Sequence, residues 1–163
     1  VHELVSHLED CFLIRTVWIE SESERRRMVN PRKVYPIDTG LMPIFDRTGR
    51  ANLGHALETA VLLELERRHY AVTYVRTPEG HQVDFLARHP GGAQLLVQVC
   101  ATAEADGTRE RELRSLSEAR LHYPDATPVL LVATRDGLLS GVPAGIVAKA
   151  AYEWFLLEAE DGV

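Results

Sequence analysis

The sequence predicts an α/β fold in which a mixed central sheet is flanked by helices. The 163 residues include 45% hydrophobic and 26% charged side chains, a composition that excludes a disordered or fibrous chain. From residue 52 onward, helical and strand-like hydrophobic patterns alternate along the chain. Residues 129–133 form an uninterrupted apolar run, which is typical of a buried central strand. Together these observations indicate helices packed on the faces of a sheet.

The first fifty residues predict a helix, a strand, a polar tip and a second strand. Apolar side chains recur at helical spacing over residues 2–13, and residues 12–19 are rich in β-branched and aromatic side chains. Residues 20–30 are polar and indicate a mobile hairpin tip, and residues 33–37 form the second strand. Because this order matches the tail end of a winged-helix unit, we predict a partial winged-helix element.

The remaining elements follow a polar joint at residues 46–52. Asn52 is a favourable N-cap for a helix over residues 53–69. Three strands, a helix, a strand and a last helix are then predicted, over residues 72–76, 82–88, 94–100, 108–122, 129–133 and 143–157. We therefore divide the chain into a winged-helix element with its connector, residues 1–50, and an α/β domain, residues 51–163.

The charge of the chain is unevenly distributed. The formal net charge is −6, and the whole excess lies in residues 51–163, because residues 1–50 are balanced. A surface that binds nucleic acid would therefore lie in the first part. The candidate phosphate contacts are the basic side chains of the tip and of the next strand, Arg25, Arg26, Arg27, Arg32 and Lys33. The neighbouring acids, Glu20, Glu22 and Glu24, favour the alternative of a solvated tip.

Cysteine usage and hydropathy indicate the cellular setting. Cys11 and Cys100 are the only cysteines, and they have neither disulfide-framework nor metal-ligand spacing, so a reduced cytoplasmic setting is expected. No apolar run reaches the roughly 18 residues of a membrane span, so we expect no membrane partner. The chain begins at Val1 inside an expected helix, and we interpret it as part of a longer protein.

The predicted hairpin at residues 82–100 brings polar side chains together. If the turn at 89–93 closes symmetrically, Leu86 faces Leu96 and Asp84 faces Gln98. One face of the hairpin then carries Gln82, Asp84, Leu86, Gln98 and Cys100, and the other carries Val83, Phe85, Val97 and Val99. The sequence thus predicts a compact polar cluster around Asp84 and Gln98.

A glutamate on the predicted helix over residues 53–69 points toward the same region. Glu58 shares an inward stripe with Val61, Leu62 and Leu65. A carboxylate on such a stripe needs a partner, because an unpaired buried charge is costly. Two inward acids, Glu58 and Asp84, would suit a divalent cation with oxygen ligands. A buried arginine that pairs with Glu58 is the alternative.

Several stretches resemble a known family. They are Leu8–Ile14, Val34–Leu41, Gly54–Glu58, Tyr74–Thr77 and Glu79–Phe85. In these stretches the chain resembles the C-terminal domain of unknown function of bacterial and archaeal AAA-type ATPases. That domain is similar to the PD-(D/E)XK, or restriction-endonuclease-like, nuclease superfamily. The resemblance implies a restriction-endonuclease-like core over residues 51–163 and an upstream AAA-type ATPase module in the same protein.

The resemblance assigns motif positions in this sequence. It implies that Glu58 and Asp84 are the metal-binding acids, with Mg²⁺ or Mn²⁺ as the ion. The superfamily's third motif is Glu-x-Lys, but this chain has Gln98-Val99-Cys100. The catalytic positions are thus Glu58, Asp84, Gln98 and Cys100, and the motif is degenerate. An arginine such as Arg76 or Arg111 could lie nearby, but arginine is a poor base. We therefore expect weak or no cleavage.

Three functions compete at this point. The first is an inactive nuclease-like accessory module of an AAA-type ATPase that binds nucleic acid or a partner protein. The second is a Mg²⁺- or Mn²⁺-dependent DNA endonuclease or exonuclease. The third is a pure protein-interaction or oligomerisation domain, which the acidic charge of residues 51–163 favours. No P-loop is present in the sequence, so ATP would bind only the upstream module, and no resident cofactor is expected in this chain.

Overall fold

Five strands form one mixed sheet at the centre of the molecule. The computed structural model describes residues 2–45, 52–101, 106–138 and 141–157. The sheet contains, in spatial order, β3 (Ala71–Arg76), β4 (Gln82–Arg88), β5 (Gln94–Cys100), β6 (Thr127–Val132) and β7 (Val147–Ala150). β4 pairs antiparallel with both β3 and β5, whereas β5, β6 and β7 run parallel to one another. The predicted mixed sheet is confirmed.

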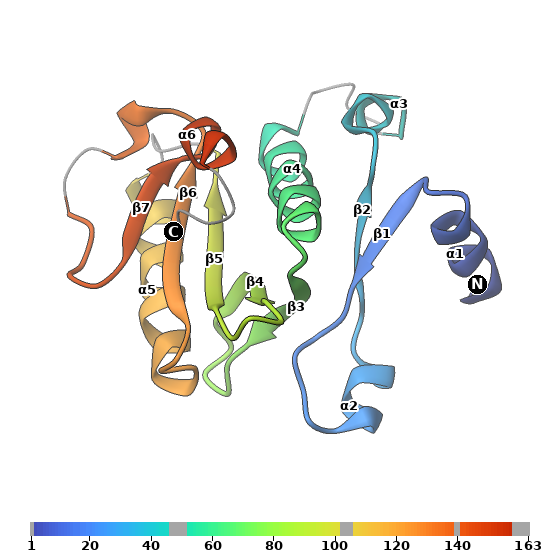
Figure 1. Cartoon of the computed structure of the whole chain (residues 1–163), viewed down its shortest axis with the longest axis horizontal. Coiled ribbons are helices and arrows are strands. Elements are labelled where there is room, and N and C mark those ends of the chain that lie inside the picture. Colours follow the sequence, from blue (N-terminus) through green and yellow to red (C-terminus); the bar gives the residue numbers. More distant parts are fainter. Residues whose placement is uncertain (1, 46–51, 102–105, 139–140, 158–163) are drawn as a thin grey trace.

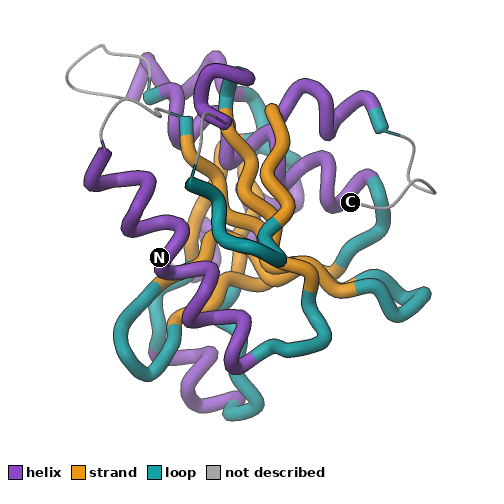
Figure 2. The backbone as a smooth tube through the Cα atoms, turned by 90° about the vertical axis from the view of Figure 1, so that its left-hand side faces the viewer, coloured by secondary structure: helices purple, strands orange, loops and turns teal. Residues whose placement is uncertain are grey.

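Helices cover both faces of this sheet (Figures 1 and 2). On one face, α4 (Leu53–Arg67) and α6 (Ala151–Leu156) bury side chains such as Leu62 and Trp154. On the other face, α5 (Asp106–His122) buries Leu116. Asn52 caps α4 as predicted, because its side chain accepts a hydrogen bond from the His55 N–H. Within the described ranges, no helix is both long and apolar enough to cross a membrane.

The N-terminal elements form a two-stranded ribbon that packs on the α4 face. After α1 (His2–Asp10), β1 (Ile14–Val17) pairs antiparallel with β2 (Lys33–Pro36). Val17, Ile19 and Tyr35 are buried in the same apolar cluster as α4 and the central strands. Tyr74 of β3 forms an isolated parallel bridge with Ile19, which joins the ribbon to the sheet. The winged-helix assignment of this part stays a prediction.

Two segments differ from their predicted structure. The polar tip contains a short helix, α2 (Glu24–Val29), because the Ser23 side chain accepts from the Arg26 N–H and starts a turn. The predicted helix over 143–157 is wrong, since its first part forms strand β7 and only α6 is helical. A short apolar run fits a strand or a helix equally well, and pairing with β6 decides for the strand.

After β2 the chain forms a 3₁₀ turn, Thr39–Leu41, and α3 (Met42–Phe45). Another 3₁₀ turn, Arg135–Leu138, lies between β6 and β7. Most of the predicted joint at 46–52 lies outside the described residues.

The β4–β5 hairpin has the predicted register, with Leu86 opposite Leu96. The backbone pairing ends at Phe85 and Val97, one residue before Asp84 and Gln98. The β3–β4 pairing shifts register between Thr73 and Val75. The expected face of Val83 is therefore wrong, because Val83 packs in the cluster of α5 rather than in the cluster that contains Phe85. This irregular end of the hairpin is where the polar side chains gather.

Candidate functional site

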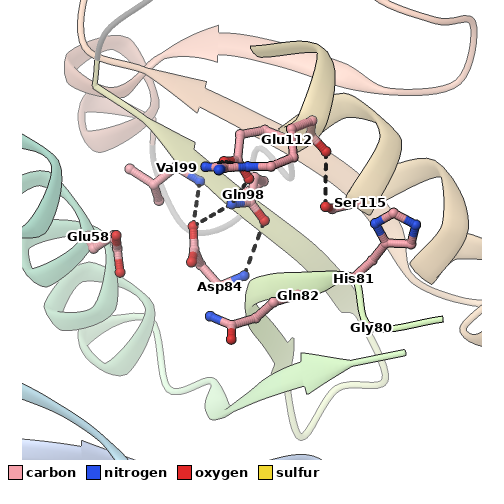
Figure 3. A pocket seen from close by; sticks show the side chains of 10 residues that line it. Glu58, Gly80, His81, Gln82, Asp84, Gln98, Val99, Glu112 and Ser115 are labelled. Atoms are coloured by element: carbon pink, nitrogen blue, oxygen red, sulfur yellow. Dashed lines mark hydrogen bonds and ion pairs between the residues drawn. The ribbon is translucent and has the colours of Figure 1, made fainter. Parts of the chain in front are cut away.

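A polar pocket of about 390 Å³ lies among α4, the β4–β5 hairpin and α5 (Figure 3). Three carboxylates line it, one from each side: Glu58 of α4, Asp84 of β4 and Glu112 of α5. Gln98 of β5 lies among them. Glu58 and Asp84, which the sequence places near each other, do share one pocket. Glu112 is an additional acid that the sequence did not indicate.

Asp84 is held by groups that the end of the hairpin leaves unpaired. Its side chain is 9% exposed. The Oδ2 atom accepts hydrogen bonds from the Val99 N–H at 3.1 Å and from Gln98 Nε2 at 2.8 Å. In return, the Asp84 N–H donates to Gln98 Oε1 at 3.2 Å. Because buried backbone N–H groups need acceptors, these side chains continue the hydrogen bonding where the strand ladder stops.

Lys33 fills the space between the two predicted metal-binding acids. Its Nζ lies 2.8 Å from Asp84 Oδ1 and 3.9 Å from Glu58 Oε2. The side chain is 20% exposed, and its ammonium lies 5.8 and 5.9 Å from the ring centroids of Tyr74 and Phe85. We predicted Lys33 as a phosphate contact at the tip. The structure instead places its ammonium in the carboxylate cluster. The degenerate third motif, Gln98-Val99-Cys100, contains no lysine of its own.

Glu58 has an unusually high pKa in this environment. Burial and the charge of Asp84 raise the pKa of Glu58 to about 7, against the lowering effects of Lys33 and of a hydrogen bond from Tyr35. The Tyr35 hydroxyl donates to Glu58 Oε2 at 3.0 Å. Burial and the Glu58 charge also raise the pKa of Tyr35 well above its ordinary value. Glu58 is therefore close to half protonated at neutral pH.

Glu112 is paired on both of its oxygens. Oε2 accepts from Gln98 Nε2 at 2.6 Å, and Oε1 lies 2.7 Å from Arg111 Nη2. Arg111 thus lines the pocket, whereas Arg76 is exposed at the end of β3 and is not among the pocket residues. Lys33 and Arg111 offset two of the three carboxylates, and Glu58 takes up a proton near pH 7. The cluster is nearly neutral without any bound ion.

These residues do not fit a resident Mg²⁺ or Mn²⁺ ion. Such ions require oxygen ligands in near-octahedral geometry. Both lone pairs of Asp84 Oδ2 already accept hydrogen bonds, and Oδ1 pairs with Lys33. Gln98 turns its amide N–H toward the carboxylates of Asp84 and Glu112, and its carbonyl oxygen accepts from the Asp84 backbone N–H, which fixes that orientation. In the described parts of the chain, no group of three His, Cys, Asp or Glu side chains is arranged to hold a metal.

The other predicted site residues lie elsewhere. Cys100 is the last residue of β5 and is buried in the apolar cluster under α5. Arg25, Arg26 and Arg27 are exposed on α2, and none forms an ion pair with another described residue. Arg32 lies over the ring of Trp18, with 3.5 Å between the guanidinium carbon and the ring centroid. The basic tip and the carboxylate pocket are thus two separate features.

One signal in the sequence could have indicated that Lys33 faces the carboxylate pocket. On a strand, residues two apart face the same side, so Lys33 follows Tyr35 toward α4. Tyr35 is 1% exposed and stacks on His55, with 5.2 Å between ring centroids. An aromatic residue on a short strand is a good candidate for burial, and a lysine two positions earlier then faces the same interior.

Comparisons of the chain with protein-family models, with curated proteins and with solved structures found no match.

Proposed function

We propose that this chain is a nuclease-like accessory module of an AAA-type ATPase, located in the cytoplasm, which binds nucleic acid and does not cut it. The observation that carries this proposal is the contact between Lys33 and Asp84, at 2.8 Å. The resemblance supplies the setting, an ATPase module that would control the binding. The pocket supplies the argument against cleavage, and the tip supplies the argument for binding.

The argument against cleavage rests on charge and on ligand geometry. A metal-dependent phosphodiesterase needs a metal to activate water and to stabilise the developing charge. In this pocket the ammonium of Lys33 lies beside the same two carboxylates that would hold the metal. Displacing it would separate a partly buried ion pair, which costs free energy. Internal neutralisation by Lys33 therefore competes with metal binding.

The argument for nucleic-acid binding rests on α2. Three consecutive arginines are exposed there, and arginine forks suit phosphate oxygens. The nearby acid Glu20 attracts Arg27, but it is also paired with Arg88 through two hydrogen bonds at 2.9 and 3.0 Å. Burial alone would raise the pKa of Glu20, but hydrogen bonds from Arg88 and Thr73 lower it below its ordinary value. Glu20 is thus a satisfied carboxylate within the fold.

Replacing the arginine triplet should weaken binding and reduce its salt dependence. For the full chain, the triple variant Arg25→Ala, Arg26→Ala, Arg27→Ala is expected to bind a fluorescent oligonucleotide at least about tenfold more weakly at 100 mM salt. The slope of log K against log salt should fall by roughly two to three, one for each lost phosphate contact. Fluorescence anisotropy between 50 and 200 mM salt measures both quantities.

A matched control changes three other exposed arginines by the same total charge, namely Arg76→Ala, Arg114→Ala and Arg120→Ala. This control is expected to bind as the wild type does. If both triple variants lost the same affinity for the oligonucleotide, the net charge of the chain would explain the loss. That result would reject the tip as the contact surface. Absence of wild-type binding at 50 mM salt would reject nucleic acid as the ligand. Nicking of plasmid in Mn²⁺, lost in Asp84→Asn, would reject the non-cutting assignment.

A further inference from the structure

A second pocket, of about 260 Å³, lies beside α2 and shares no lining residue with the carboxylate pocket. It is lined by Trp18, Glu24, Arg27, Met28 and Thr73. The proposed phosphate contact Arg27 thus forms part of the wall of a hollow that also contains an indole ring. Pockets for whole small molecules are usually roughly 300–1,000 Å³, so this one suits a single ring system.

Trp18 is held both at its backbone and at its ring. Its backbone carbonyl accepts a hydrogen bond from the Tyr74 N–H at 2.8 Å, and the next residue, Ile19, is 1% exposed. The guanidinium of Arg32 covers the ring at 3.5 Å from the centroid, a cation–π contact. Trp18 is therefore a fixed aromatic surface beside the arginines, and its conformation needs little further ordering when a ligand binds.

Apolar, polar, basic and acidic side chains line this pocket. Met28 lines it and is 64% exposed, and the adjacent Val29 is 75% exposed. Arg25 and Arg26 are exposed on the same short helix. The wall contains one acid, Glu24, and one arginine, Arg27, and Glu20 near Thr73 is paired with Arg88. Exposed apolar side chains beside arginines that form no ion pair with another described residue suit a ligand with flat apolar faces and negative charge.

We propose that this pocket takes one unstacked base, so that the ligand of the module is single-stranded nucleic acid. The inference rests on the proposed function and deepens it. Proteins that bind single strands combine a basic surface for the backbone with aromatic rings on which bases stack. In a duplex the faces of the bases are covered by their neighbours, so no base can enter a pocket that holds one ring. The arginines of α2 contact phosphates, and Trp18 contacts the base.

The test compares three probes: a dT12 strand, an abasic 12-mer with the same number of phosphates, and a 12-base-pair duplex. The wild-type chain is expected to bind dT12 about 5- to 150-fold more tightly than the abasic strand, which is the range for one stacked base. It should also prefer dT12 to the duplex. Trp18→Ala should reduce the dT12-to-abasic ratio toward one.

Trp18→Phe is the control for a folding defect, because it keeps an aromatic ring in the pocket. It should retain part of the preference for dT12. Quenching of tryptophan fluorescence by dT12 should be lost in Trp18→Phe, since the remaining tryptophan, Trp154, is 1% exposed. An unchanged dT12-to-abasic ratio in Trp18→Ala would overturn this inference and leave the arginine contacts intact. Tighter binding of the duplex, or quenching by an acidic peptide but not by dT12, would also overturn it. Failure of every probe to bind would reject the proposed function itself.

Discussion

Replacing Lys33 by methionine is expected to lower the free energy of unfolding by about 3 kcal/mol at pH 8. Methionine keeps the length of the side chain and its packing near Tyr74 and Phe85, but it removes the ammonium. Asp84 would then be a buried carboxylate with one oxygen unpaired. Breaking one side of a buried ion pair costs about 3–5 kcal/mol, and the 20% exposure of Lys33 favours the lower end. Urea denaturation measures the change.

Two further variants make this prediction specific. The double variant Lys33→Met, Asp84→Asn should recover most of the loss, because it removes the orphaned charge and keeps an oxygen for the Val99 N–H. Lys149→Met is the matched control, since Lys149 is the other lysine of the sequence and forms no ion pair with a described residue. It should change stability by less than about 0.5 kcal/mol. A Lys33→Met variant as stable as this control would contradict the pairing.

The stability of the chain is expected to fall as pH rises through neutrality, because of Glu58. Its folded-state pKa, about 7, lies above the ordinary value of 4.5. Between these two values the folded state holds one more proton than the unfolded state, so the free energy of unfolding falls as pH rises. The slope from this group is at most about 1.4 kcal/mol per pH unit. This contribution is fully present below the unfolded-state value and is lost above pH 7.

Glu58→Gln should remove this pH dependence. The glutamine oxygen can still accept the Tyr35 hydroxyl, and the uncharged side chain no longer repels Asp84. The variant should therefore be more stable than the wild type at pH 8 and close to it at pH 5. Urea denaturation from pH 5 to 9 measures both curves. Glu110→Gln, an exposed site on α5, controls for the change in net charge. Parallel curves for wild type and Glu58→Gln would rule out the raised pKa.

Local patterns predicted the sheet and the approach of two acids. Alternating side chains and the Pro90-Gly91-Gly92 turn predicted β4 and β5 with their observed bounds. The same register placed Asp84 beside Gln98, and the apolar stripe of α4 turned Glu58 toward them. These predictions depended on contacts within one element or one hairpin, which the periodicity of the side chains encodes.

Contacts between distant elements were not predictable in the same way. Lys33 reaches Asp84 across 51 residues of sequence, and nothing in the local pattern of β2 names that partner. Glu112 lies on a helix that is polar for most of its length, so its inward direction had no clear apolar signature. The segment of β7 became a strand only because β6 offers a parallel edge. In each case contacts between distant elements determined the structure, because local propensity was compatible with more than one arrangement.

Titration of the wild-type chain with Mn²⁺ by calorimetry tests most directly whether Lys33 replaces a metal in the carboxylate pocket. Asp84→Asn serves as the comparison variant, and both are measured at pH 8, where Glu58 is largely ionised. The internal pairing of Asp84 with Lys33, Gln98 and Val99 predicts no Mn²⁺ binding in either protein. Stoichiometric binding by the wild type that is lost in Asp84→Asn would contradict it.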